Sequence, residues 1–236
     1  MVFLEGFINL LFPPYCPLCG KDVLDQDGGG FCKECTSLLI PIREPLCPGC
    51  SIPYPGSSIN HFCQECSEKK RYYDRGRCLF IYDGKIKEAF HLFKYAGRRS
   101  LINSFEKLIP KQIPSPLGKY DLIIPVPLHR NKLRKRGFNQ SLLIAHAVGK
   151  LWGIHVNPFI LKKIKDTPPQ TGLSYDERAK NLKEAFFVSN PRMVINKNIL
   201  LVDDIFTTGF TIQECARALK KSGVNSVDFF TIARTI

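Results

Sequence analysis

Ile199-Leu-Leu-Val-Asp-Asp-Ile-Phe-Thr-Thr-Gly-Phe-Thr211 is the stretch of this sequence that decides the fold. Its apolar residues predict a buried parallel strand that ends at two carboxylates, Asp203 and Asp204. A turn rich in hydroxyl groups follows, and apolar residues then recur with helical spacing, at Ile212, Cys215, Ala216 and Leu219. The stretch therefore predicts a strand, a turn of phosphate size and the N-terminus of a helix.

This turn has the properties of an anion-binding site. Backbone N–H groups of such a turn, together with the helix dipole, attract a phosphate. The two carboxylates at the end of the strand are placed to accept hydrogen bonds from the hydroxyl groups of a sugar. A phosphate and a diol that lie one sugar apart describe a ribose 5-phosphate, so these residues predict a phosphoribosyl ligand. A strand–turn–helix without a ligand is the alternative.

The same stretch resembles the motif with which type I phosphoribosyltransferases bind phosphoribosyl pyrophosphate (PRPP). The resemblance implies that Asp203 and Asp204 hold the ribose hydroxyls. It also implies that the turn binds the 5-phosphate, through Thr207, Thr208, Gly209 and Thr211. One residue departs from the pattern, because Phe210 stands where the family often has a second glycine. Phe210 must therefore tolerate the geometry of the turn or point outward.

Eight of the ten cysteines fall in four Cys-x-x-Cys pairs. Twelve residues separate the two pairs of each half, and every cysteine of the first half recurs 31 positions later. This is the pattern of a duplicated unit, and paired Cys-x-x-Cys turns near this separation are typical of tetrahedral zinc sites. We expect two structural zinc ions bound in sequence order, although the spacing also allows an interleaved pairing. The expected ligands are Cys16, Cys19, Cys32 and Cys35 for one ion, and Cys47, Cys50, Cys63 and Cys66 for the other.

Disulfides and iron–sulfur ligation are the alternatives for these cysteines. No secretory signal precedes them, which favours free thiolates and predicts a cytoplasmic protein. The apolar N-terminal stretch at residues 1–14 is too short to span a membrane and predicts a docked helix. No other stretch predicts a transmembrane segment.

The 236 residues allow one α/β domain of roughly 150–160 residues beside the cysteine-rich unit. The predicted fold class is α/β, with the mostly parallel, helix-flanked sheet of a type I phosphoribosyltransferase and a small N-terminal double zinc-ribbon domain. We expect residues 1–72 to form the N-terminal helix and the double zinc ribbon. Residues 73–236 are expected to form the phosphoribosyltransferase-like domain.

Positive charge is concentrated in the middle of the chain. The formal net charge is +13, and nine Lys or Arg but no Asp or Glu occur from Leu122 to Lys165. This bias favours an anionic partner such as pyrophosphate, nucleic acid or both. Residues 128–140 match the position of the pyrophosphate loop of the type I family, and residues 165–184 that of the loop that closes over the substrate. We expect Lys94, Arg134 and Arg136 to bind the diphosphate of Mg²⁺-PRPP.

From about residue 13 to its end, the sequence resembles the ComF (ComFC-like) family of bacteria. The landmarks include Cys-Pro-x-Cys, Lys-Tyr-x-Gly, Arg-x-Arg-Gly-Phe-Asn-Gln and the acidic pair with its Thr-Thr-Gly turn. The resemblance implies a role in DNA uptake or handling during natural transformation, with single-stranded DNA and other competence proteins as candidate partners. The alternative is an active phosphoribosyltransferase with an unidentified acceptor and no direct role with DNA. The sequence assigns neither an acceptor nor a catalytic residue.

Overall fold

The computed structural model describes residues 14–23, 30–54, 56, 58–95, 98–167 and 182–236. The predicted N-terminal helix and most of the predicted loop at 165–184 lie outside these residues.

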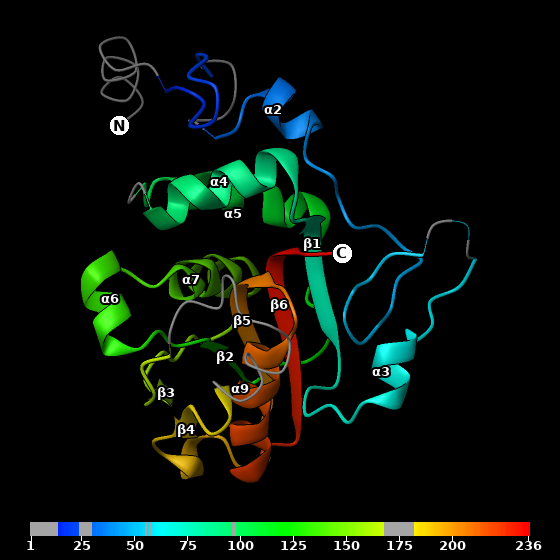
Figure 1. Ribbon diagram of the computed structural model, residues 1–236, viewed down its shortest axis with the longest axis vertical. Helices are drawn as coiled ribbons and strands as arrows, with labels where there is room; N and C mark the ends of the chain where they lie inside the picture. The colour runs from blue at the N-terminus through cyan, green and yellow to red at the C-terminus, as the bar shows by residue number, and fades with distance from the viewer. Residues whose placement is uncertain (1–13, 24–29, 55, 57, 96–97, 168–181) are drawn as a thin grey trace.

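A four-stranded parallel sheet forms the centre of the molecule (Figure 1). Its two inner strands are buried along most of their length, which accounts for their nearly continuous apolar sequence. The strands lie in the order β1 (Gly76–Ile81), β6 (Ser226–Arg234), β5 (Asn198–Phe206) and β2 (Leu122–Pro125).

Helices cover both faces of this sheet, and alternate residues of β5 contribute to the two cores. Leu200 and Val202 pack on one side, whereas Ile199 and Leu201 pack on the other. The first face is covered by α4 (Gly84–Tyr95), α5 (Leu101–Gln112) and α7 (Gln140–Trp152). The second face is covered by α9 (Phe210–Lys221) and by an antiparallel pair, β3 (Leu161–Lys163) and β4 (Phe186–Val188).

Four short helices complete the described structure. They are α2 (Lys33–Ser37), α3 (Gln64–Glu68), α6 (Arg130–Arg136) and the 3₁₀ turn η1 (Pro191–Met193). Helices α2 and α3 begin after Cys32 and Cys63, whose sulfur atoms accept the backbone N–H of Cys35 and Cys66 at 3.4 Å.

The two cysteine groups belong to cores on different faces of the sheet. The first packs near α5, where the rings of Phe31 and Phe105 meet edge-on at 5.8 Å. The second belongs to the core on the α9 side. Both groups therefore share cores with the larger predicted domain, whose boundary at residues 72–73 stays a prediction from the sequence.

The connection between the two cysteine groups runs along strand β1. The N–H of Ile42 donates to the carbonyl of Leu79 at 2.7 Å, and the N–H of Ile81 donates to the carbonyl of Ile40 at 2.9 Å. Pro41 and Phe80 form an antiparallel bridge between them. The connection thus satisfies backbone groups on the outer side of β1.

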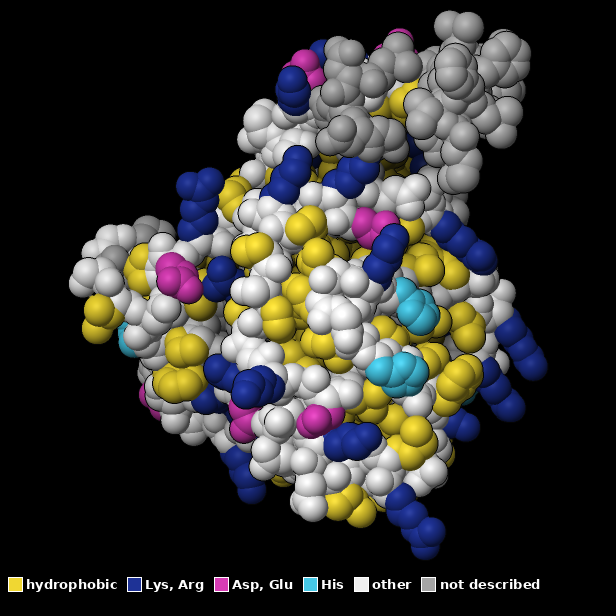
Figure 2. All heavy atoms as spheres, turned by 180° about the vertical axis from the view of Figure 1, so that it is seen from behind, with side chains coloured by type: hydrophobic (Ala, Val, Ile, Leu, Met, Phe, Trp, Pro, Cys, Tyr) yellow, Lys and Arg dark blue, Asp and Glu magenta, His cyan; other side chains and the backbone are white. Residues whose placement is uncertain are grey.

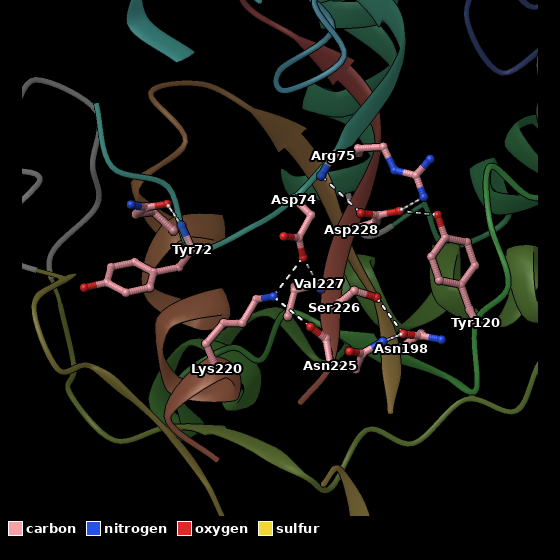
Figure 3. Close-up of polar contacts among 11 residues, drawn as sticks. Tyr72, Asp74, Arg75, Tyr120, Asn198, Lys220, Asn225, Ser226, Val227 and Asp228 are labelled. Atoms are coloured by element: carbon pink, nitrogen blue, oxygen red, sulfur yellow. Dashed lines mark hydrogen bonds and ion pairs between the residues drawn. The ribbon is translucent and has the colours of Figure 1, made fainter. Parts of the chain in front are cut away.

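A polar network fixes the segment that leads from the second cysteine group into β1 (Figure 3). Asp228 is 2% exposed and accepts the N–H of Arg75 at 3.1 Å and the hydroxyl of Tyr120 at 2.9 Å. Asp74 accepts the N–H of Val227 at 2.8 Å and the ammonium of Lys220 at 2.9 Å. The segment is therefore bonded to both β6 and α9.

Replacing Asp228 by alanine leaves the amide of Arg75 and the hydroxyl of Tyr120 without their acceptor. We expect the free energy of unfolding, measured with urea, to fall by about 2 kcal/mol. Glu106→Ala removes an exposed carboxylate from α5 and should change it by less than about 0.5 kcal/mol. Equal losses in the two variants would contradict this role of the network.

Candidate functional site

A cavity of about 700 Å³ lies at the carboxyl ends of the parallel strands. Its lining includes Tyr82 after β1, Pro127 after β2 and Thr207 after β5. Open α/β sheets bind their ligands at this end, because the loops that follow the strands converge there. The cavity is therefore the candidate ligand-binding site.

The two predicted carboxylates reach this cavity and are held by named partners. The ammonium of Lys94, from α4, lies 2.7 Å from Oδ2 of Asp204. The hydroxyl of Ser141, at the start of α7, donates to Oδ1 of Asp203 at 2.7 Å. Backbone amides complete the arrangement, because the N–H of Ile205 donates to Asp204 at 2.7 Å. Both carboxylates are therefore fixed in place before any ligand binds.

Burial makes the charge of this pair costly. Burial and the neighbouring charge of Asp204 raise the pKa of Asp203 to about 7. Burial alone would lower the pKa of Lys94, but the Asp204 carboxylate outweighs it and the net shift of that pKa is upward. One carboxylate is thus neutralised by Lys94, while the other changes its charge near neutral pH.

The turn from Thr207 to Thr211 joins β5 to α9 and depends on one glycine. Gly209 has φ +75°, and a Cβ there would lie 2.6 Å from the ring of Phe206. Phe210, the departure from the family pattern, is the first residue of α9 and packs on the α9-side core. A second glycine is unnecessary because the positive φ falls only on Gly209 within this turn.

The amide hydrogens at the start of the turn, at Thr207, Thr208 and Gly209, are available to an anion. Among the described residues, none accepts a hydrogen bond from the backbone N–H of Thr207, Thr208 or Gly209. The hydroxyl of Thr208 is also buried, with no hydrogen-bond partner in the described part of the chain. Thr207 and Thr211 line the 700 Å³ cavity, whereas Thr208 and Gly209 line a second cavity of about 480 Å³ behind the turn. These features are those of a phosphate-binding turn.

Three cations line another part of the first cavity. Lys132 and Arg136 lie one helical turn apart on α6, and Lys163 comes from β3. None of the three forms an ion pair with a carboxylate in the described part of the chain. Burial and the neighbouring Lys132 lower the pKa of Lys163 to about 8. The cluster therefore offers unneutralised positive charge to an anionic ligand.

The structure brings most of the predicted ligand-binding residues together. Lys94 and Arg136 line the cavity with the two aspartates, although the ammonium of Lys94 is paired with Asp204. Arg134 is exposed and is not among the lining residues, because a residue two positions from Arg136 points to another side of a helix.

Three residues of the site were missed by the sequence analysis. The i, i+4 spacing to Arg136 would have identified Lys132 once α6 was recognised as a helix. Ser141 and Lys163 carried no such signal, since tertiary packing alone brings α7 and β3 to the end of β5.

Both cysteine groups have the geometry of four-ligand metal sites. The four sulfur atoms of each group lie within 4.8 Å of one another, in the sequential pairing that we expected. The Sγ atoms of Cys19 and Cys32 are 3.6 Å apart, and those of Cys50 and Cys63 are 3.7 Å apart. A tetrahedral zinc ion with Zn–S bonds of about 2.3 Å places its sulfur atoms about 3.8 Å apart. The residues present therefore fit zinc, and the distances are far too long for disulfides.

In the described residues, no helix has both the length and the apolar character needed to cross a membrane.

Comparison with known families agrees with this architecture. Residues 7–67 match the double zinc ribbon domain, and residues 153–235 match the phosphoribosyl transferase domain. The fold and the site thus define a phosphoribosyltransferase-fold protein that carries a double zinc ribbon. Competence protein ComFC of Bacillus subtilis (strain 168) is 30% identical to this chain over 215 residues, which cover 86% of this chain and 84% of ComFC. The chain belongs to the ComF family.

Two further relatives match at 28% identity. Competence protein F of Haemophilus influenzae aligns over 86% of this chain and 96% of its own length. DNA utilization protein YhgH of Escherichia coli (strain K12) aligns over 96% of this chain and all of its own length. Among solved structures, an adenine phosphoribosyltransferase is 17% identical and covers 61% of this chain and 74% of its own, with a TM-score of 0.35, too loose a superposition to support an argument.

The raised pKa of Asp203 has a consequence for stability. Because the native state binds this proton more tightly than the unfolded chain, Asp203 favours folding below about pH 4, and this contribution is lost as the pH rises through 7. Asparagine at this position stays neutral at every pH. The free energy of unfolding of Asp203→Asn, minus that of the natural protein, should therefore be larger at pH 8 than at pH 4.5 by on the order of 2 kcal/mol.

Urea unfolding at the two pH values measures this difference. The exposed carboxylate of Glu106, replaced by glutamine, provides the control. If the difference in free energy of unfolding between Asp203→Asn and the natural protein is the same at both pH values, folding does not raise the pKa of Asp203.

Proposed function

We propose that the 700 Å³ cavity binds the phosphoribosyl group of PRPP together with Mg²⁺. The observation that supports this most is the coincidence of three features at one cavity: a carboxylate pair of which Asp204 is buried, a turn in which the amides of Thr207, Thr208 and Gly209 have no acceptor among the described residues, and an unneutralised cationic cluster. Each feature suits one part of PRPP, which consists of a ribose diol, a 5-phosphate and a diphosphate.

In this proposal the ribose hydroxyls donate hydrogen bonds to Asp203 and Asp204, whose positions are fixed by Ser141 and Lys94. The 5-phosphate accepts hydrogen bonds from the amides of the turn at Thr207–Thr211. The diphosphate lies near Lys132, Arg136 and Lys163. Arg136 can bind phosphate oxygens in a bidentate manner, since among the described residues only its Nη1 has a partner, Oε1 of Gln140 at 2.8 Å.

Magnesium fits the donor set of this cavity, because it prefers carboxylate and phosphate oxygens. Asp203 or Asp204 together with the diphosphate would hold it, and when bound it would neutralise the charge of the departing diphosphate.

An active phosphoribosyltransferase is the second candidate. Tyr82, Phe90 and His91 line the same cavity as the aspartates, so an acceptor has flat surfaces to pack against. In such a reaction the bond from C1 of the ribose to the diphosphate breaks, and its electron pair leaves with pyrophosphate. A lone pair of the acceptor forms the new bond to C1, and the acceptor releases a proton. Release of pyrophosphate from PRPP that depends on an added acceptor would identify this activity.

We further propose that the protein acts on the cytoplasmic side of DNA uptake, with single-stranded DNA and other competence proteins as partners. The names of its relatives refer to competence and to DNA utilization. Lys and Arg side chains outnumber acidic ones over the face in Figure 2, which suits a nucleic-acid partner. Arg134 and Lys135 project from α6 into solvent and are the residues that we assign to this contact.

The sugar site is tested by the double variant Asp203→Asn, Asp204→Asn. Without two carboxylates to accept the ribose hydroxyls, calorimetric binding of Mg²⁺-PRPP should fall at least a hundredfold, corresponding to two charge-assisted hydrogen bonds. Zinc content and the circular dichroism spectrum should not change. Undiminished affinity in a folded double variant would remove the assignment.

Helix α6 allows the two anionic ligands to be separated. Lys132→Ala with Arg136→Ala should weaken the binding of inorganic pyrophosphate about tenfold or more, because both side chains face the cavity. Arg134→Ala with Lys135→Ala should spare pyrophosphate but weaken single-stranded DNA. If these two side chains contact two phosphates, the slope of log affinity against log salt should decrease by about 1.4. If both double variants weaken pyrophosphate and single-stranded DNA to the same extent, the assignment of one face of α6 to pyrophosphate and the other to DNA is wrong.

A further inference from the structure

The second cysteine group lies directly behind the phosphate-binding turn. Cys50 and Cys66 line the 480 Å³ cavity together with Thr208 and Gly209. The turn is therefore the wall between this cavity and the site for the sugar, since Thr207 lines both. The second cysteine group is therefore close enough to the turn for a change in its structure to alter the turn.

Arg234 connects the two. It is the last residue of β6 and is only 7% exposed. Its Nη1 donates a hydrogen bond to the carbonyl of Cys50, and its guanidinium carbon lies 5.4 Å from the centre of the Phe206 ring. The next residue, Thr235, donates its N–H to the carbonyl of Phe206 at 3.0 Å. Arg234 thus joins a metal-ligating residue to the residue that precedes the turn.

Phe206 in turn supports the glycine of the turn. Its ring lies against Gly209, where a Cβ would come within 2.6 Å of it. The same ring stacks on Phe229 at 4.8 Å with an interplanar angle of 6°, and Tyr73 meets it edge-on at 6.4 Å. A shift of Phe206 would therefore remove the surface that holds Gly209 at its positive φ.

The other end of the turn is tied to the same unit. The side chain of Gln213, in the first turn of α9, donates to the carbonyl of Lys70 at 2.8 Å and accepts the N–H of Tyr72 at 3.1 Å. Lys70 follows the last ligand of the second group, Cys66, by four residues. Both ends of the turn are thus bonded to the polypeptide around the second cysteine group.

The first cysteine group has no comparable connection among the described residues. Its contacts run to α5 through Phe31 and Phe105, and to Arg98, whose Nη1 donates to the carbonyl of Pro17 at 3.2 Å. Neither contact involves the turn, so the first group provides an internal control.

We propose that Arg234 and Gln213 are positioning residues through which metal binding at the second cysteine group, and not at the first, sets the conformation of the phosphate-binding turn. This inference deepens the proposed function, because it assigns control of that same site to one of two apparently equivalent zinc ribbons. Its first test needs no ligand.

Hydrogen exchange of two amides bonded to the ends of the turn is that test: the N–H of Thr235, which donates to the carbonyl of Phe206 at 3.0 Å, and the N–H of Gln213, which donates to the carbonyl of Gly209 at 2.8 Å. Arg234→Met retains all eight cysteines but loses the bond to Cys50, and should speed exchange of these two amides about tenfold or more, as expected for one lost charge-assisted hydrogen bond. Arg234→Lys, which keeps a donor, should restore much of the protection. Arg98→Met, the same change at an exposed arginine bonded to the first group, should leave the turn unchanged. Unaltered exchange in Arg234→Met would overturn the proposal.

Metal removal at single sites gives the same comparison. Cys63→Ser should lose one zinc ion and speed exchange of the same two amides, whereas Cys19→Ser should lose one ion without that effect. Equal acceleration by both variants would overturn the proposal, and the Arg234 variants decide it even if Cys63→Ser does not fold.

Calorimetry then connects the turn to ligand binding. Arg234→Met should weaken ribose 5-phosphate about tenfold while leaving inorganic pyrophosphate within about twofold, since only the former uses the turn. Equal weakening of both ligands would indicate general loss of structure and count against a positioning role. If the natural protein binds no ribose 5-phosphate but the exchange results hold, the proposed function fails and the coupling stands.

Discussion

The placement of two adjacent carboxylates, Asp204 buried and Asp203 half-buried, at the end of a central strand is the constraint on which the rest of the structure depends. Such a pair is unfavourable unless it is compensated, and Lys94 and Ser141 supply the compensation from two different helices. These bonds fix α4 and α7 against the carboxyl end of β5, where the cavity forms. The same bonds that compensate the two carboxylates therefore also position the helices that line the cavity.

Features that are local in the sequence could be predicted from it. The strand, the acidic pair and the turn at Thr207–Thr211 are contiguous, and the sequential grouping of the cysteines follows from a short and regular spacing. Arg134 was predicted to bind the diphosphate because residues 128–140 were treated as a loop, and a loop does not determine which of its cations face inward. The structure forms a helix there, so that Lys132 and Arg136 share the inner face.

Features that depend on long-range packing could not be predicted. Lys163 reaches the cavity only because the antiparallel pair β3–β4 folds against the sheet, and nothing in its neighbours indicates this. The same holds for the cysteine groups. Their cysteine spacings are identical, yet one group packs with α5 and the other with α9, so the spacing does not predict their different surroundings.

The connection at Ile40–Ile42 explains how a duplicated unit can occupy both faces of one sheet, since it must pass around the outer strand β1 to do so. In passing, it satisfies amide and carbonyl groups that an outermost strand would otherwise offer to other molecules. A fragment that began at β1 would expose the amide and carbonyl groups on the outer edge of this strand, and it would be prone to self-association. The cysteine-rich segment consequently protects the edge strand of the sheet as well as carrying two candidate metal sites, and the part of the chain with the phosphoribosyltransferase fold depends on it for a covered edge.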